Sequence, residues 1–244
     1  MGQPAKCIGG EFLMADYLVT DTELKSVADS IRAKGGTTEK LAFPTGFKSA
    51  VDSIPSGGGS GAKEPYIEET YDADGNLIDV NLVGYTAIRP YAFYNCTNLA
   101  SASLPSGVTS IGNLAFQECE NLALTSLPSG VTSIGNEAFY NCTNLALTSL
   151  PSGITSIRNH VFRGCTNLAL TSLPSGITSI GNYAFYNCTG LTSITFQSKP
   201  TVISSSAFSE CTNLKTINVP WASGEVANAP WGATNATINY NYTG

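Results

Sequence analysis

The amino-acid sequence predicts an α/β solenoid of parallel strands and short helical turns, with a small N-terminal helical unit and a C-terminal cap. The main observation is a period of 23 residues that runs from about residue 85 to residue 219. Self-similarity at a fixed step is typical of architectures in which each coil stacks its apolar side chains on the next coil. Four residue types keep the period over six copies: Ile88, Ile111, Ile134, Ile157, Ile180, Ile203; Phe93, Phe116, Phe139, Phe162, Phe185, Phe208; Cys96, Cys119, Cys142, Cys165, Cys188, Cys211; and Leu99, Leu122, Leu145, Leu168, Leu191, Leu214.

Each copy contains the parts of one coil. In residues 131–153 we expect Ile134 to point inward and the stretch NEAFYNC to form a short helical turn with Phe139 and Cys142 in the core. The stretch LPSG then turns the chain, since Pro and Gly supply a fixed and a permissive backbone conformation. The period of 23 lies within the 20–29 residues of leucine-rich repeats.

The repeats resemble the bacterial surface leucine-rich repeats of the BspA-like type, with the pattern LxxIxLPxxVxxIxxxAFxxCxx. The stretches LTSITF and LKTINVP match this pattern well, and the resemblance covers about residues 82–220. It implies a leucine-rich-repeat solenoid. Fold alone does not identify a ligand, because repeat scaffolds bind many kinds of partner.

The segments before the repeats are interpreted from N- to C-terminus. Residues 1–13 are an expression remnant or a misassigned start, since a more natural opening begins at Met14. Residues 14–54 predict a helical unit for anchoring or homo-oligomerisation, with a capping box at Thr20 and Glu23. Residues 55–63 are a Gly/Ser linker. These assignments place a separate attachment unit ahead of the solenoid.

Residues 64–84 predict a hairpin that caps the repeats of residues 85–219, and residues 220–244 predict a C-terminal cap. Asp72, Asp74 and Asn76 resemble the start of a calcium loop, but the rest of such a loop is missing, so we prefer a hairpin turn. Trp221 and Trp231 are expected to cover the last coil, as a terminal repeat requires.

The composition argues against several classes of partner. Charged residues make up 12% of the chain and the net charge is −6, which disfavours nucleic acids and anionic membrane surfaces. No run of 18 apolar residues predicts a membrane span, and the N-terminal stretch contains no visible signal peptide. We therefore expect no nucleic-acid partner and no membrane insertion.

Catalytic and metal-binding motifs are missing from the sequence. It contains no GxSxG, P-loop or HExxH motif. The one histidine, His160, lies between Arg158 and Arg163 in a small basic spot and is interpreted as a surface residue. We expect no enzyme activity, no cofactor and no metal.

The evenly spaced cysteines are interpreted as free, buried side chains that fill the core. Each coil carries one such cysteine in the same place, so no coil has a matched pair, although disulfides or a metal remain alternatives. The sequons at Asn95, Asn141 and Asn187 are interpreted as turn residues.

The positions that depart from the template are the candidates for ligand binding. Adjacent copies match at 19 and at 17 of 23 positions, so the differences attract interest. The residue after the core phenylalanine varies: Tyr94, Gln117, Tyr140, Arg163, Tyr186, Ser209. Tyr94, Tyr140, Arg163 and Tyr186 are of the types enriched in binding hot spots. The alternative is that these tyrosines merely shield the neighbouring coil.

A second departure concerns the strand that follows the first leucine of each copy. The middle copies place Leu124, Leu147 and Leu170 one position before the expected isoleucine. Strand alternation would turn these leucines outward into an apolar stripe that marks an interaction site. Alternatively, a small bulge would place each leucine in the core.

Two further resemblances concern the ends of the chain. The stretch YLVTDTELKSVADSIRAKGG and its continuation to Ile54 resemble a leader on phage and prophage structural proteins of gut Firmicutes. The tail from Val219 resembles the cap of similar repeat proteins. Together they imply an extracellular, cell-surface or virion-associated protein that binds a protein or a cell-surface glycan. The alternative is a structural spacer of a phage particle without a ligand of its own.

Overall fold

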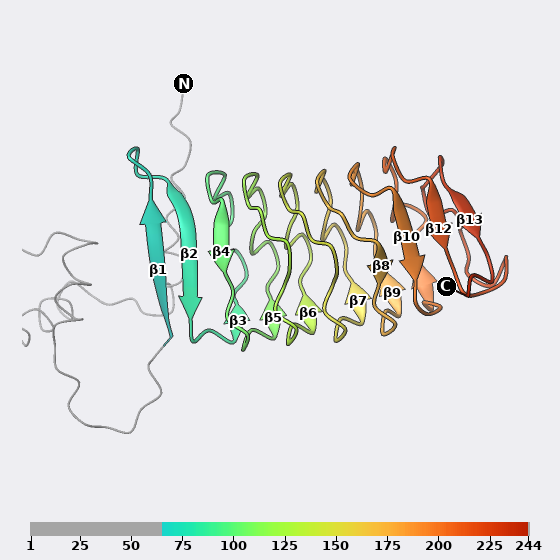
Figure 1. Ribbon diagram of the computed structural model, residues 1–244, viewed down its shortest axis with the longest axis horizontal. Coiled ribbons are helices and arrows are strands. Elements are labelled where there is room, and N and C mark those ends of the chain that lie inside the picture. The colour runs from blue at the N-terminus through green and yellow to red at the C-terminus, as the bar shows by residue number, and fades with distance from the viewer. Residues whose placement is uncertain (1–64, 244) are drawn as a thin grey trace, which may run out of the picture. The chain divides into compact units, whose positions relative to one another are not determined.

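The computed structural model describes residues 65–243, which form a solenoid of short strands (Figure 1). A fixed register follows from the sequence period, because each coil has the same length and the same inward-pointing residues. The described strands are β1 (Tyr66–Tyr71), β2 (Leu77–Val83), β3 (Ala87–Ile88), β4 (Ser101–Ser103), β5 (Ser110–Ile111), β6 (Ser133–Ile134), β7 (Ser156–Ile157), β8 (Ser172–Leu173), β9 (Ser179–Ile180), β10 (Ser193–Phe196), β11 (Val202–Ile203), β12 (Thr216–Asn218) and β13 (Thr237–Asn239).

The strands lie in two rows along the solenoid (Figure 1). The first strand wall contains β3, β5, β6, β7, β9 and β11, and the second contains β2, β4, β8, β10, β12 and β13. Neighbours within a wall are parallel, and Ile111 pairs with Ile134 one period further on. The predicted parallel-strand solenoid is therefore confirmed. Both walls are interrupted: β6 does not pair with β7, and β4 does not pair with β8.

The stretches that join the first wall to the second form a third side, called here the turn wall. The prediction of helical turns is wrong, since residues 65–243 contain no helix and these stretches are consecutive turns. In the coil of residues 131–153, Glu137 and Asn141 have φ of 58° and 55°. The amide N–H groups of Phe139 and Asn141 donate to the next coil, to the carbonyls of Val161 (3.0 Å) and Arg163 (2.7 Å). A helix would keep these bonds within its own segment.

The sequon asparagines take part in this geometry. Asn95, Asn141 and Asn187 all have positive φ, between 55° and 58°. Asparagine is among the residues that adopt this left-handed conformation most readily. Their role as turn residues is confirmed.

The core is a set of columns that run through the stacked coils. The phenylalanine rings from Phe93 to Phe208 stack at centroid separations between 5.0 and 5.8 Å. All six phenylalanines are completely buried. Each ring therefore contacts the same ring of the coils before and after it, which couples neighbouring repeats in stability.

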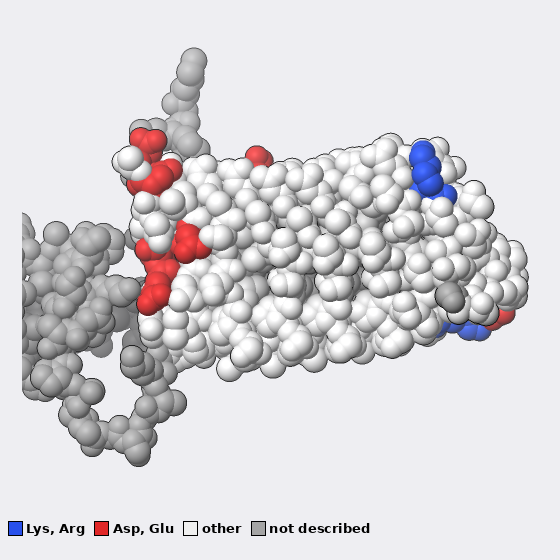
Figure 2. Space-filling model, viewed as in Figure 1, with Lys and Arg blue, Asp and Glu red and all other residues white. Residues whose placement is uncertain are grey.

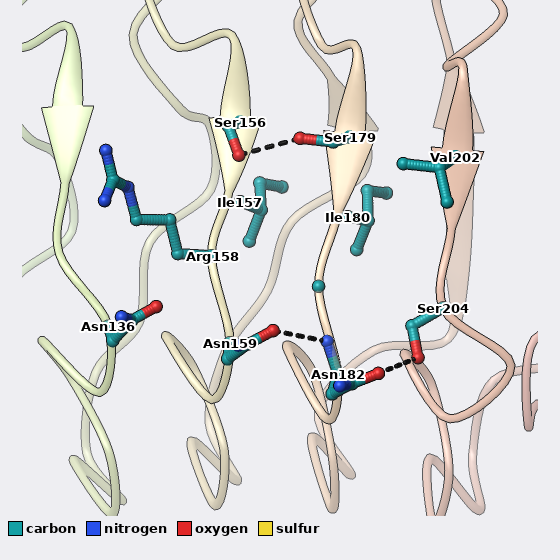
Figure 3. Close-up of a pocket in the computed structure, with 11 residues that line it drawn as sticks. Asn136, Ser156, Ile157, Arg158, Asn159, Ser179, Ile180, Asn182, Val202 and Ser204 are labelled. Carbon is teal, nitrogen blue, oxygen red and sulfur yellow. Dashed lines mark hydrogen bonds between the residues drawn. The ribbon is translucent and has the colours of Figure 1, made fainter.

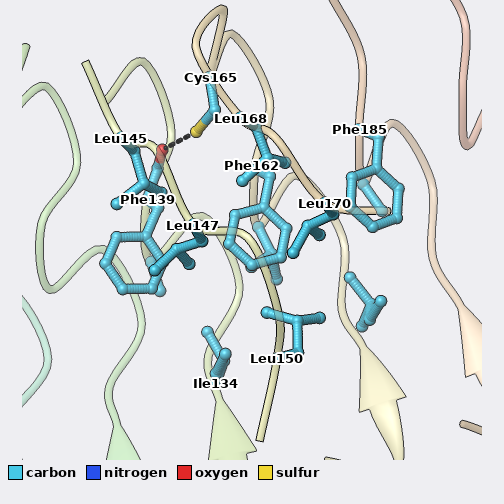
Figure 4. Packing of buried hydrophobic residues seen from close by; sticks show 14 of the residues in the cluster. Ile134, Phe139, Leu145, Leu147, Leu150, Phe162, Cys165, Leu168, Leu170 and Phe185 are labelled. Carbon is cyan, nitrogen blue, oxygen red and sulfur yellow. Dashed lines mark hydrogen bonds between the residues drawn. The ribbon is translucent and has the colours of Figure 1, made fainter. Parts of the chain in front are cut away.

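The cysteines form a second column beside the rings. Cys119, Cys142, Cys165, Cys188 and Cys211 are free and buried, as predicted. Cys96 is also buried but is disulfide-bonded, so the prediction of a free thiol is wrong for this residue. Each of the five thiols donates to the carbonyl of the phenylalanine one coil earlier; Cys165 Sγ, for example, lies 3.0 Å from Phe139 O (Figure 4). Burial raises the pKa of all five thiols, that of Cys211 to about 12. The cysteines therefore join coils by hydrogen bonds as well as by packing.

Of the two alternatives for the leucines of the middle copies, the inward placement is right for Leu147 and Leu170, and the outward apolar stripe is wrong. Leu147 has no exposed surface and Leu170 is 2% exposed (Figure 4). Leu124 is half-buried against the core. The inward residues of the usual strand, such as Ile194 and Phe196, are two positions apart. Leu147 and Leu150 are three positions apart, so a regular strand cannot point both inward. The backbone around Leu147 therefore forms no paired strand, and the second wall is interrupted at this coil.

The two ends of the solenoid are closed differently. At the start, β1 and β2 form an antiparallel hairpin. Its turn is held by Asp72, whose Oδ1 accepts the amide N–H groups of Asp74 (3.0 Å) and Asn76 (2.8 Å). The hydrogen bond from the Asn76 side chain to Oδ2, followed by these backbone bonds, lowers the pKa of Asp72. At the other end, Trp221 and Trp231 are buried and pack around Phe196.

The assignments of residues 1–13, 14–54 and 55–63 lie outside the described residues. Within residues 65–243, no helix is long and apolar enough to cross a membrane.

Candidate functional site

Two columns of side chains lie on the outside of the turn wall. The first follows the core phenylalanines; Tyr94 in this column is 46% exposed, and the other members are half-buried. The second lies three residues earlier in each coil, at the first residue with positive φ. Its members are Tyr91, Leu114, Glu137, His160 and Tyr183. This second column was not predicted, although its residues vary from copy to copy beside the constant Ala-Phe or Val-Phe pair.

The tight turns bring the two columns into contact. Tyr91 and Tyr94 meet edge to face, with ring centroids 6.0 Å apart, and Tyr183 and Tyr186 do the same at 5.6 Å. The His160 ring stacks on Tyr183 at 5.4 Å. These contacts fix the tyrosines against one another, so little side-chain freedom remains to be lost on binding.

Arg163 lies at the centre of one such group. Its guanidinium carbon is 4.6 Å from the ring centre of Tyr186, 5.4 Å from that of Tyr140 and 5.9 Å from that of Tyr183. Cation–π attraction holds within about 6 Å. We call Tyr140, His160, Arg163, Tyr183 and Tyr186 the aromatic–arginine cluster. It unites three of the four predicted turn-wall residues, whereas Tyr94 lies two coils before Tyr140 and pairs with Tyr91.

Arg163 is compensated by aromatic faces rather than by carboxylates. The ion pair found within residues 65–243 joins Lys199 and Glu225 at 2.6 Å, far along the chain from the cluster. On the face shown in Figure 2, most acidic side chains gather at the β1–β2 end and the basic ones lie toward the C-terminal end. The guanidinium therefore keeps hydrogen-bonding capacity for a ligand, because a ring face takes up none of its N–H donors.

The cluster does not have the geometry of a catalytic centre. His160 Nδ1 is buried without a hydrogen-bond partner, whereas a catalytic histidine needs an orienting acceptor and a nucleophile. In the described part of the chain, no group of three His, Cys, Asp or Glu residues could hold a metal ion. The arrangement of rings around a cation is suited to recognition.

Comparison with solved structures finds bacterial leucine-rich-repeat proteins. The T. pallidum leucine-rich-repeat protein is 28% identical, with a TM-score of 0.49, over 63% of this chain and 81% of that one. A leucine-rich cell surface protein of Faecalibacterium prausnitzii is also 28% identical, with a TM-score of 0.49, over 66% of this chain and 56% of that one. A leucine-rich-repeat protein of Eubacterium ventriosum is 26% identical, with a TM-score of 0.44, over 59% and 40%.

A comparison with curated proteins gives no significant match. The family model described as the BspA type leucine-rich repeat region matches six times over residues 86–215. This range is more than half of the chain and coincides with the stacked coils that carry the phenylalanine and cysteine columns. The chain therefore belongs to the family of proteins with BspA type leucine-rich repeats.

Proposed function

We propose that the chain is a non-enzymatic binding module that presents the aromatic–arginine cluster to a protein or glycan on a cell surface. The observation that carries the proposal is the placement of Arg163 against three tyrosine rings, with no carboxylate partner among residues 65–243. Tyrosine and arginine are the residue types that contribute most at binding hot spots. The turns hold these side chains in place, so the ordering cost of binding is small.

The setting we propose is the surface of a bacterium or of a phage particle. The family comprises repeat scaffolds, and the resemblance of residues 14–54 to phage and prophage leaders supports a virion-associated role. In this scheme the solenoid engages the host, while residues 14–54 attach the protein or join copies of it. A spacer without a ligand is the alternative that the experiment must separate.

The test uses the full chain, fluorescently labelled, on gut Firmicutes cells and on a glycan array. We expect saturable binding that falls at least about tenfold when Tyr140 and Tyr186 are both changed to alanine, since each is a hot-spot residue. Tyr94→Ala is the matched control, because Tyr94 occupies the same column outside the cluster. Binding that survives the double change would refute the assignment to the cluster. Absence of binding, together with oligomers in sedimentation, would favour the spacer.

A further inference from the structure

One position of the first strand wall, directly after the inward isoleucine, varies between glycine, serine and arginine from coil to coil. Three coils have glycine after the inward isoleucine: Gly112, Gly135 and Gly181. A Cβ atom there would lie 2.4 to 2.5 Å from atoms of the preceding coil, which no real contact allows. In the coil of residues 154–176 this position is Arg158. The largest side chain therefore stands where the neighbours carry none.

The first wall is interrupted at this coil. Gly135 N and Thr132 N each donate to the preceding coil at 2.8 Å. The equivalent pairing of β7 with β6 is missing, and the sheet is divided there. Figure 3 shows the Arg158 side chain extending between the two strands. Ser204, at the same position two coils on, keeps its backbone bond to Ile180 (2.9 Å), so a small side chain is tolerated.

The asparagine ladder below the strands stops at the same boundary. Asn113 Oδ1 accepts the amide of Asn136, and Asn159 Oδ1 accepts the amide of Asn182, both at 2.9 Å. No corresponding bond joins Asn136 to Asn159 in the described structure. On the turn wall the same two coils remain bonded, through Glu137 N and Asn159 O at 3.1 Å. The coils are thus separated on one side only.

A groove of about 500 Å³ lies over β7, β9 and β11, and Asn136 of the preceding coil lines its edge next to Arg158 (Figure 3). Arg158 is the one charged residue that lines it, and the ion pair of residues 65–243 does not include it. The other polar lining consists of neutral serine and asparagine side chains, among them Ser156, Ser179 and Asn136. The groove therefore combines one cation with hydroxyl and amide groups.

We propose that this groove binds an acidic saccharide, with Arg158 holding a carboxylate or sulfate and the Ser and Asn side chains holding hydroxyl groups. Arginine pairs bidentately with carboxylate and sulfate-like oxygens, and hydroxyl and amide side chains both donate and accept hydrogen bonds. The coil gives up backbone pairing to carry Arg158, and rules of local structure are typically broken at functional sites. The proposal deepens the proposed binding function and rests on it, but it concerns a different wall from the aromatic–arginine cluster.

The test measures calorimetric binding of trigalacturonic acid and of its neutral methyl ester to the full chain. We expect the acid to bind, and to bind about 10- to 100-fold more weakly to Arg158→Gln, because a hydrogen-bonded charge is lost. Arg89→Gln is the matched control, since Arg89 has the same template position in the first coil, and its affinity should match the unmodified chain. Arg158→Gly should fold normally and also lose the acid.

Three outcomes would overturn the site: equal binding of acid and ester, equal losses in the Arg158 and Arg89 variants, or no binding of the acid. Preference for a poly-glutamate peptide over the saccharide would overturn the ligand class. Each of these results leaves the cell-binding test of Tyr140 and Tyr186 unaffected, so the two proposals fail separately.

Discussion

Raising the pH is expected to unfold the solenoid through its cysteine column. The five free thiols are buried, and burial raises their pKa above the ordinary value of 9.0. Unfolding returns each thiol to water, where it ionises near its ordinary pKa. The folded chain therefore binds more protons than the unfolded chain above pH 9. Stability from this source is complete below about pH 8 and is lost as the pH rises from 9 toward 12.

The size of the effect follows from the number of thiols. One group that ionises only in the unfolded state lowers the free energy of unfolding by about 1.4 kcal/mol for each pH unit above its unfolded pKa. Five such thiols together remove about 5 kcal/mol between pH 9 and pH 10, where the unfolded thiols go from half to nearly full ionisation, and about 7 kcal/mol for the next pH unit. A domain is stable by about 5 to 15 kcal/mol, so we expect unfolding between about pH 10 and pH 11.

The assay is urea denaturation at several pH values between 7 and 10, followed by tryptophan fluorescence and circular dichroism. Cys165→Ser removes one titrating group and offers a hydroxyl to Phe139 O, so the pH slope should fall by about a fifth. Tyrosines also ionise in this range, but they are the same in both chains and cancel in the difference.

An unchanged pH slope in Cys165→Ser would refute the reasoning. Alkylation offers an independent check, since only the thiolate reacts. At pH 8 the peptides containing Cys119 to Cys211 should be modified only as fast as the chain unfolds. Modification at the rate of a free thiol in the native protein would contradict the buried column.

Three further predictions concern stability and use thermal or urea unfolding. Arg158→Gly should raise the free energy of unfolding by about 1 kcal/mol, and the Tm by about 2–4 °C, as two backbone bonds gained outweigh the glycine entropy. Leu147→Ser should lower the free energy of unfolding by about 3–5 kcal/mol, because it leaves a cavity and buries a hydroxyl. The matched change in the exposed neighbour, Thr148→Ser, should alter it by under about 0.5 kcal/mol. Trp231→Ala should cost about 3–5 kcal/mol, since this buried ring closes the last coil and donates from Nε1 to Ala227 O at 2.8 Å.

Each of these predictions has a clear contrary result. A lower Tm for Arg158→Gly would mean that the arginine side chain supports the wall rather than separating its coils. If Leu147→Ser left the free energy of unfolding unchanged, Leu147 would have to lie at the surface rather than in the core. If Trp231→Ala left the free energy of unfolding unchanged, the last coil would not depend on Trp231 to shield its core.

The repeat period was sufficient to predict the stacking of the coils, the parallel strands and the composition of the core columns. Residues such as Phe139 and Phe162, spaced by one period, must lie above one another if every coil has the same length. The sequence also placed Tyr140, Arg163 and Tyr186 in one outward column. It did not reveal that Tyr183 and His160 complete the cluster, since that contact depends on the shape of the turn.

The shape of the turn could not be read from the pattern. Phe139 and Cys142 are three residues apart, a spacing that a helix and a pair of successive turns share. The turns are formed because their amides bond to the next coil, which is absent until the coils stack. The position of Leu147 was left open for the same reason: its burial depends on space between neighbouring coils.

The sequence by itself determined the solenoid, its register and its buried columns, because a strict period forces identical residues into identical environments. Only the tertiary structure decided the turn conformation, the inward leucines, the ring of tyrosines around Arg163 and the opening at Arg158. Each of these depends on contacts between side chains and backbone one coil apart, which no single repeat contains.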